Sequence, residues 1–397
     1  MTTAVQGTLG QEPGPAAGQR AGGAGQAAGP GAIWEIIHGF TSYWAVVAAL
    51  DLNLFDVLAE RGPRQVPAEE LAAAVGAAAP GDLALLADVL VSLGLLTGDG
   101  RGYRLTPLSG RFLVSTAETS MAALVRLSPG PVGAWPALAR TITAGRPAVT
   151  VDDDPAAFYP ALSAATAPTQ AAVAAGVTAR PAELDAWPPA ATVVDLGAGS
   201  GAWVSTMLAL RPDARAVAVD LPGVVEAVTR TARARGVADR LTVVAGDYLA
   251  VQLPVQSADV VVLAHVLRAE SPRRAARLVA RAVRLAGPDG TVVVADYPRP
   301  DPPAAPSADR DQVCAAGRHD LLLGLTMLAS TAAGRGITVA DLRSWAGAAG
   351  AEVVDSIEPL PRQRVHLIRS APRRARGCPS PDGRASPGSG PRGAPPA

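Results

Sequence analysis

The sequence predicts an α/β protein in which a doubly wound parallel sheet follows a smaller, mostly helical domain. From residue 190 to 370, short apolar runs alternate with amphipathic helical patterns, which is typical of repeated βαβ units. From residue 32 to 115, three helical patterns precede two short strands around a Gly-Asp-Gly turn, which is the element order of a winged helix. A chain of 397 residues is long enough for both domains.

A glycine turn lies at the start of the predicted sheet. The apolar run Thr192–Leu196 predicts a buried strand, and Gly197, Gly199 and Gly201 follow it before a helical pattern over residues 200–210. Glycines let the backbone come close to a ligand, and the N-terminus of a helix presents free N–H groups to it. Strand, turn and helix therefore predict a nucleotide-type site, with an ordinary βα turn as the plainer interpretation.

Asp195 separates two possible ligands of this turn. Residues 197–202 also satisfy the dinucleotide pattern G-x-G-x-x-G/A, so the glycines alone permit a nicotinamide cofactor. A carboxylate inside the strand end would crowd a pyrophosphate, but it can face the ammonium of an amino-acid group. Asp195 therefore favours a ligand that carries such an ammonium.

Polar residues also follow the other predicted strands, at the sheet edge where ligands of open α/β sheets bind. Asp220 can accept hydrogen bonds from ribose hydroxyls, or it caps a helix that begins near Pro222. Asp247 can accept from an adenine amino group while the ring of Tyr248 stacks on the base; the alternative is an exposed turn. Further such residues are His265, Arg268 and Asp296.

The segments outside the sheet have different predicted roles. Residues 33–50 form an amphipathic helix with four of the chain's 15 aromatic residues, which indicates either a core helix or a subunit interface. Residues 116–189 are mostly helical and precede the glycine strand, so we expect a connector that closes over a ligand. Residues 1–31 are rich in Gly, Ala and Pro, and residues 371–397 are rich in Pro, Gly, Arg and Ser. We predict that both segments are disordered tails.

The predicted winged helix does not have the chemistry of a DNA-binding module. Its would-be recognition helix, residues 82–93, has two acidic residues and no basic or amide side chain. Such a helix can neither neutralise phosphates nor bind base edges. We therefore expect a packing function and no nucleic-acid partner.

Composition excludes several other classes. The 35 basic residues, all arginine, balance 35 acidic ones, so no basic field for nucleic acid or a membrane surface is expected. There is no signal-peptide pattern and no uninterrupted apolar run of 18 residues, and we predict a cytoplasmic protein without a membrane partner. Cys314 and Cys378 are too far apart in the sequence to indicate a disulfide framework or a cysteine metal site.

Taken together, the motifs resemble S-adenosylmethionine (SAM) dependent small-molecule O-methyltransferases of plants and bacterial natural-product pathways. The resemblance rests on residues 195–201, 220–222, 246–248 and 288–290 and on the winged-helix order, and it covers about residues 32–370. It implies the Rossmann-like fold of class I SAM methyltransferases over residues 190–370. It also implies a homodimer formed by the N-terminal helices, and transfer of a methyl group to a hydroxyl of an aromatic or polyketide-like acceptor. The implied cofactor residues are Asp195, Gly197, Gly199, Gly201, Asp220, Leu221, Asp247, Tyr248 and Ala264.

One departure from the family pattern affects the catalytic group. The family has a general-base histidine after the fourth strand, where this chain has Arg268. An arginine stays protonated, so it cannot accept the proton of a hydroxyl, although it can bind a carboxylate or stabilise a phenolate or enolate. Three alternatives remain: His265 one helical turn earlier is the base, His319 beside Asp320 is the base, or positioning alone suffices. We predict catalytic roles for His265, Arg268 and His319.

The departure leaves other functions open. His265 and His319 with Asp320 or Glu270 could bind a metal, but their spacing is not diagnostic, and we predict no metal site. Within the family, transfer to carbon or nitrogen, or a member that no longer methylates, is the first alternative. A SAM-sensing winged-helix regulator and a nicotinamide-dependent oxidoreductase are less favoured.

Overall fold

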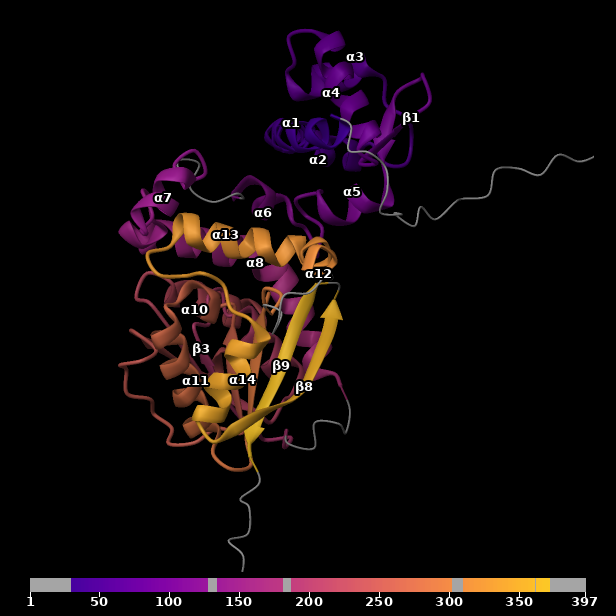
Figure 1. Ribbon diagram of the computed structural model, residues 1–397. Coiled ribbons are helices and arrows are strands. Elements are labelled where there is room, and N and C mark those ends of the chain that lie inside the picture. Colours follow the sequence, from indigo (N-terminus) through magenta and orange to yellow (C-terminus); the bar gives the residue numbers. More distant parts are fainter. Residues whose placement is uncertain (1–29, 128–133, 181–186, 302–309, 361, 372–397) are drawn as a thin grey trace, which may run out of the picture.

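The computed structural model describes residues 30–127, 134–180, 187–301, 310–360 and 362–371. The two predicted tails lie almost wholly outside these residues. A helical N-terminal region stands at one end of the molecule and the sheet at the other, with helices α8 and α13 between them (Figure 1).

The N-terminal region has the predicted winged-helix order. Strands β1 and β2 pair antiparallel, with Leu96 opposite Leu105. The would-be recognition helix α4 buries Leu83, Ala87 and Leu90, so its apolar face is used for packing. The elements are α1 Gly31–Asp51, α2 Leu54–Glu60, α3 Ala68–Val75, α4 Pro80–Ser92, β1 Leu96–Gly98, β2 Tyr103–Leu105 and α5 Pro107–Phe112.

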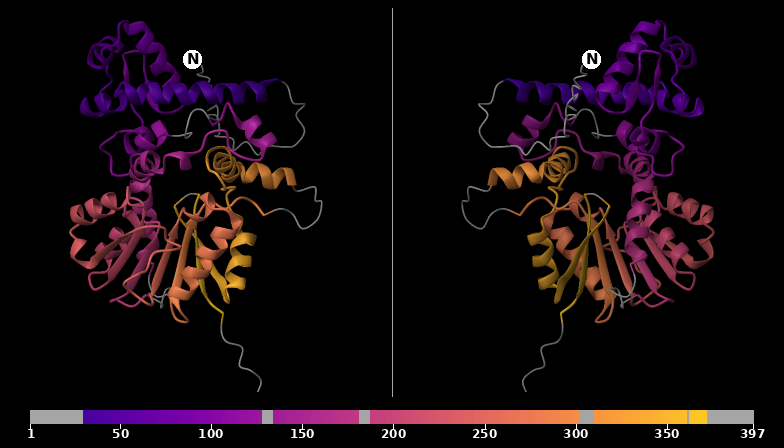
Figure 2. Two further views of the ribbon diagram at one scale, coloured as in Figure 1. Left: turned by 90° about the vertical axis from the view of Figure 1, so that its left-hand side faces the viewer. Right: turned by 90° about the vertical axis from the view of Figure 1, so that its right-hand side faces the viewer.

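Helix α1 buries only its C-terminal end and leaves an apolar surface uncovered. Val47, Ala49 and Leu50 are buried. The large apolar side chains that remain exposed on it are Ile33, Trp34, Ile36, Ile37, Phe40 and Trp44. Figure 2 shows α1 as a long indigo helix on the side of this region that faces the sheet domain. Of the described helices, α1 alone is long and apolar enough by itself to span a membrane, although polar residues interrupt its apolar sequence.

A helical connector leads from this region to the sheet. It comprises α6 Ala122–Leu127, α7 Leu138–Ala144, the short 3-10 helix η1 Val151–Asp153 and the long helix α8 Pro155–Thr178. The C-terminal part of α8 belongs to the core of the sheet domain, where Val173, Ala174 and Val177 are fully buried. The other end of α8 is therefore held over the sheet edge.

The main sheet has seven strands in the order β5-β4-β3-β6-β7-β9-β8. The first five are parallel, as predicted, whereas β9 pairs antiparallel with both β7 and β8. The strands are β3 Thr192–Leu196, β4 Arg215–Asp220, β5 Leu241–Ala245, β6 Val260–Ala264, β7 Thr291–Asp296, β8 Ala351–Leu360 and β9 Gln363–Ser370.

Helices cover both faces of this sheet. Helices α8, α9 and α10 share one apolar core with it, and α11 and α14 share the other. The carboxyl ends of the parallel strands therefore open at the one edge that lies beneath α8 and α13 (Figure 1). The remaining elements are α9 Ala202–Leu210, α10 Val225–Ala234, η3 Ala238–Arg240, η4 Leu267–Ala269, α11 Pro272–Ala286, α12 Arg310–Ala316, α13 Arg318–Ser330 and α14 Val339–Ala348.

Two helices, α12 and α13, lie between strand β7 and helix α14, and Gly317 separates them. A Cβ atom at Gly317 would lie 2.2 Å from Cγ of Pro300, so only glycine permits this close approach. Residues 302–309 lie outside the described part of the chain.

Candidate active site

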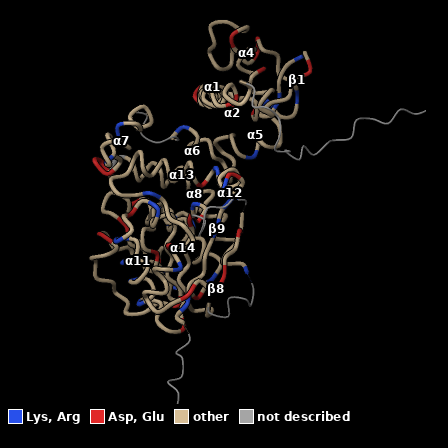
Figure 3. Tube along the Cα trace, viewed as in Figure 1, with Lys and Arg blue, Asp and Glu red and all other residues tan. Residues whose placement is uncertain are grey.

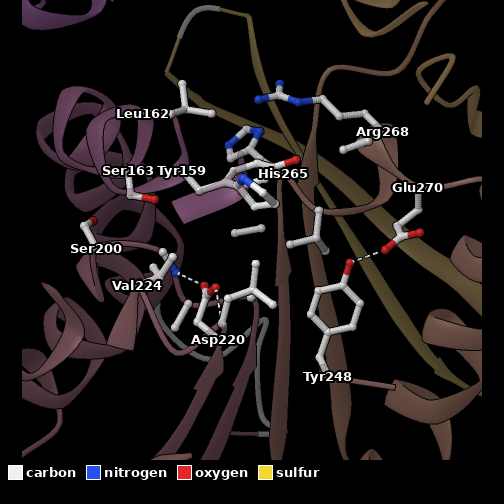
Figure 4. A pocket seen from close by; sticks show the side chains of 18 of the residues that line it. Tyr159, Leu162, Ser163, Ser200, Asp220, Val224, Tyr248, His265, Arg268 and Glu270 are labelled. Carbon is white, nitrogen blue, oxygen red and sulfur yellow. Dashed lines mark hydrogen bonds between the residues drawn. The ribbon is translucent and has the colours of Figure 1, made fainter. Parts of the chain in front are cut away.

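A cavity of about 510 Å³ lies at the carboxyl edge of the parallel strands. It is lined by the ends of β3, β4, β5 and β6 and by side chains of α8, including Tyr159 and Ser163 (Figure 4). This is the volume of a small-molecule site. The strand-end residues Asp195, Asp220, Asp247, His265 and Arg268 line this space. Asp296, which was expected with them, does not.

Asp195 lines the cavity as a buried carboxylate without a counter-ion. Asp195 is only 1% exposed to solvent. Neither carboxylate oxygen has a well-formed hydrogen bond within the described chain, and only the amide of Val204 is near enough to lower its pKa slightly. Burial, and then the charge of Asp220, raises the pKa of Asp195 to about 8. A buried carboxylate of this kind is stabilised by a cation.

The three glycines shape the backbone beside Asp195. All three have positive φ, at 89° for Gly197, 58° for Gly199 and 74° for Gly201. A Cβ atom at Gly197 would lie 2.4 Å from Cγ1 of Val266. Other residues would be strained at all three positions. Gly197 and Gly199 line the cavity, whereas Gly201 does not, and a Cβ there would meet Val228 of α10.

Asp220 binds the glycine turn directly. Its carboxylate accepts hydrogen bonds from the amides of Gly199, at 2.6 Å, and Leu221, at 2.7 Å. Burial raises the pKa of Asp220, while these two amides lower it. The alternative that Asp220 caps the next helix is wrong, because α10 begins at Val225 with Val224 in the capping position. Asp220 instead joins the ends of β3 and β4 and lines the cavity with Leu221.

Asp247 and Tyr248 belong to a charged network that the sequence did not predict. Arg274 donates to Glu270 at 2.7 Å and to both oxygens of Asp247 at 3.3 Å, and the hydroxyl of Tyr248 donates to Glu270. Burial, and then the hydrogen bond to Glu270, raises the pKa of Tyr248. The i, i+4 spacing of Glu270 and Arg274 was the available signal. The network fixes Tyr248 and Asp247 at the cavity wall, near Ala264 at the end of β6.

The connector reaches over the other side of the cavity. Oγ of Ser163 lies near the glycine turn, 3.1 Å from where a Cβ of Gly199 would be. Gln170 accepts a hydrogen bond of 2.8 Å from the indole of Trp203 on α9, which joins α8 to the helix after the turn. Asp152 of η1 accepts from the amide of Ala332 at 2.7 Å, so the connector also contacts the loop after α13.

His265 lies at the end of β6 and not in a helix, so its predicted position one helical turn before Arg268 is wrong. Its φ of 60° is in the left-handed region. Both ring nitrogens are buried and lack hydrogen-bond partners within the described chain. Burial, and then the charge of Arg268, lowers the pKa of His265 well below 6.5. The imidazole is therefore neutral at physiological pH.

Arg268 and His319 meet at Tyr297, which follows β7. The guanidinium of Arg268 lies over the Tyr297 ring, 5.1 Å from its centre. The rings of His265 and His319 lie 5.1 and 5.6 Å from the same ring, centre to centre. Arg268 and His265 line the cavity, whereas His319 does not. The residues described contain no group of three His, Cys, Asp or Glu side chains that could hold a metal ion.

Comparison with known proteins assigns the family. Residues 34–115 match the O-methyltransferase dimerisation domain, and residues 178–351 match the O-methyltransferase domain. Over 271 residues the chain is 31% identical to 3-amino-4-hydroxybenzoate 4-O-methyltransferase of Streptomyces cremeus, covering 66% of this chain and 72% of that enzyme. The chain belongs to the O-methyltransferase family. It is a SAM-dependent enzyme.

Other relatives of this O-methyltransferase differ in coverage. It is 30% identical to rat acetylserotonin O-methyltransferase over 277 residues, which are 66% of this chain and 62% of the rat enzyme. A shorter stretch of 116 residues is 35% identical to aclacinomycin 10-hydroxylase of Streptomyces purpurascens, covering 29% and 30% of the two chains. The fold matches human N-acetylserotonin methyltransferase in complex with SAM, with a TM-score of 0.69 at 22% identity, over 88% of this chain and 100% of the human one.

The residues around the cavity fit the cofactor of this family. SAM carries an ammonium that would compensate the buried carboxylate of Asp195, and the positive-φ glycines leave room beside it. The family assignment and the unpaired Asp195 both argue against the nicotinamide-dependent oxidoreductase. Helix α4 argues equally against a DNA-binding regulator, because it packs through an apolar face and carries no basic residue. Along the described chain, Figure 3 shows basic and acidic residues interspersed.

Asp195→Asn should separate stability from cofactor binding. Burial raises the pKa of the Asp195 carboxyl to about 8 in the folded protein, whereas the pKa of an aspartate in the unfolded chain is ~3.9. The wild-type fold therefore loses stability, relative to the variant, as pH rises between these two values. We expect the variant to be more stable by ~1–3 kcal/mol at pH 8, with a smaller difference at pH 5. Denaturant unfolding at both pH values measures this.

The same variant should lose affinity for S-adenosylhomocysteine (SAH) by at least about tenfold, because an amide cannot compensate an ammonium. Asp213→Asn, in the turn before β4, is the matched control and should change neither property. A variant that is less stable at pH 8 and still binds SAH normally would contradict this role of Asp195.

Proposed function

We propose that the enzyme methylates a hydroxyl of a small aromatic natural product, with the acceptor held between the sheet edge and the helices of the connector. The observation that carries this proposal is the unpaired Asp195 in a cavity that Arg268 and His265 also line. Support comes also from the relative named 3-amino-4-hydroxybenzoate 4-O-methyltransferase, whose name describes methylation of a phenolic hydroxyl.

Each part of the cavity has a proposed role. Bound SAM supplies an electrophilic methyl group, so that an oxygen–carbon bond forms as its sulfur–carbon bond breaks and SAH remains. Asp195 and the glycine turn hold the amino-acid end of SAM. Asp220 and Leu221 hold its ribose. The adenine base is held by Asp247, Tyr248 and Ala264. Helix α8 acts as a lid that excludes water, since its side chains contact the glycine turn from above.

His265 is the proposed acceptor of the hydroxyl proton. Among the described residues that line the cavity it is the one imidazole, and its lowered pKa keeps it neutral. Both of its nitrogens lack partners, so one is free to accept a hydrogen bond from an acceptor hydroxyl. His319 lies outside the cavity lining, which makes it the second choice.

A combined binding and product assay tests the proposed function. We expect SAH to bind with micromolar affinity in a calorimetric titration and NAD not to bind. With SAM and a panel of phenolic acceptors, we expect SAH and an O-methylated product in equal amounts. Binding of NAD instead of SAH would contradict the proposal.

The match to aclacinomycin 10-hydroxylase makes product analysis necessary, because that relative is named for a reaction other than methyl transfer. Arg268 in the place of the usual base favours the same second candidate, a family member that no longer methylates. A modified acceptor formed without an equal amount of SAH would support this candidate and contradict methyl transfer.

His265→Asn should lower kcat by ~10²–10⁴-fold, because the variant lacks the proton acceptor, with SAH affinity changed less than about twofold. In the wild type, kcat should stay constant as pH falls from 8 to 6.5 and decrease only below that, because the pKa of His265 is lowered. His319→Asn is the matched control. Unchanged turnover in His265→Asn would show that His265 is not the base. A large loss of turnover in His319→Asn would assign that role to His319.

The exposed face of α1 is the proposed dimer interface. The dimerisation domain supports a homodimer, and α1 carries contiguous exposed apolar side chains that a second copy would cover. Of these, Ile36 is 72% exposed and Phe40 is 68% exposed. Cytoplasmic location remains a prediction.

Ile36→Arg should shift the enzyme from dimer to monomer at micromolar concentration, because it places a charge in the proposed apolar interface. Light scattering after gel filtration measures the mass. Leu210→Arg, on the exposed end of α9, introduces the same charge elsewhere and should remain dimeric. If Ile36→Arg also remains dimeric, the interface lies on another surface.

A further inference from the structure

Arg268 carries a buried positive charge that the protein itself leaves incompletely paired. Its side chain is 15% exposed, and Nη1 lies 3.9 Å from Oδ1 of Asp296, beyond hydrogen-bonding distance. Nη1 is buried and has no hydrogen-bond partner within the described chain. A guanidinium has five N–H donors, and leaving one unsatisfied in a buried position is unfavourable.

The surrounding backbone and Tyr297 hold Arg268 in place. The amide of Arg268 donates to Asp296 at 3.3 Å, and its carbonyl accepts from the amide of Gly336 at 3.2 Å. The guanidinium lies over the ring of Tyr297. In Figure 4 it reaches back towards His265 at the cavity. Such a fixed guanidinium is suited to bind a planar anion through two parallel hydrogen bonds.

Among the charged groups near this part of the cavity, Arg268 is the cation available to bind an anionic acceptor. His265 is neutral because its pKa is lowered, and the pKa of His319 is lowered too, chiefly by burial. Arg274, the other arginine of the cavity lining, is already bound to Glu270 and Asp247. Asp296 is fully buried behind Arg268 and compensates its charge only in part.

We propose that Arg268 is a specificity residue that binds a carboxylate of the acceptor, so that the preferred acceptors are aromatic hydroxy acids. This inference rests on the proposed function. The carboxylate forms two parallel hydrogen bonds with the guanidinium nitrogens that Arg268 presents to the cavity. The ring then extends from Arg268 into the cavity, with its hydroxyl directed towards His265 and the cofactor end.

Binding to the SAH-saturated wild type gives the first test. Two probe pairs are titrated calorimetrically: salicylate with salicylamide, and hydroxynaphthoate with hydroxynaphthamide. In each pair the amide keeps the ring and hydroxyl but has no charge. We expect at least one acid to bind about 10- to 100-fold more tightly than its amide, the range expected for hydrogen bonds to a charged group. Equal affinity within both pairs, or no binding of either acid, overturns the inference.

Substitution of Arg268 gives the second test. Arg268→Gln should abolish the difference between acid and amide, and Arg268→Lys should retain part of it, because lysine keeps the charge without the planar pair of donors. SAH affinity should change less than about twofold in both variants. Arg273→Gln, on the exposed side of α11, removes an equal charge outside the cavity and should keep full discrimination.

The outcomes separate other roles of Arg268 from the proposed one. If Arg268→Gln weakens SAH binding and leaves acid discrimination intact, Arg268 binds the cofactor and the inference is wrong. If it lowers kcat equally for acids and amides without changing their affinities, Arg268 stabilises a phenolate and the inference is also wrong. Failure of the wild type to bind SAH would count against the proposed function instead.

Discussion

The buried carboxylate of Asp195 is the constraint around which the site is arranged. It lies at the end of the central strand β3, against a turn that positive-φ glycines hold open, and no described side chain pairs with it. Burial of an unpaired carboxylate is unfavourable and raises its pKa to about 8. A folded protein keeps such a residue where a ligand supplies the missing charge. We propose that the ammonium of SAM supplies this charge.

The cavity is lined by groups of both charges. Asp220 and Arg268 lie on opposite sides of it (Figure 4), and Arg268 stands where the family pattern has a histidine. Exchange of a base for a permanent cation changes what this position can do, since arginine binds anions but does not accept protons. Neutral His265 next to it keeps a group able to accept a proton within the same site. Binding and proton transfer are thus assigned to two neighbouring residues.

Local sequence predicted the parts of the site that depend on one strand and the turn after it. Asp195, the glycines and the alternation of strands and helices could be read in this way, because each is encoded within a few residues. The Arg274 network and the contacts of α8 with the glycine turn join segments that are distant in the sequence, so no local pattern reveals them. His265 was placed in a helical turn because nothing in its neighbours indicates a positive φ. No local pattern indicates the break at Gly317 either, since it depends on contact with Pro300.

Proton release on cofactor binding tests the central role of Asp195 most directly. With a pKa of about 8, this carboxyl is mostly protonated in the free enzyme at pH 7 and must ionise to pair with an ammonium. Calorimetric titration with SAH at pH 7, in two buffers of different ionisation enthalpy, measures the protons exchanged. The account predicts release of nearly one proton per site at pH 7 and about half a proton at pH 8, where the ammonium of SAH is still mostly protonated. Binding without proton release at pH 7 would contradict it.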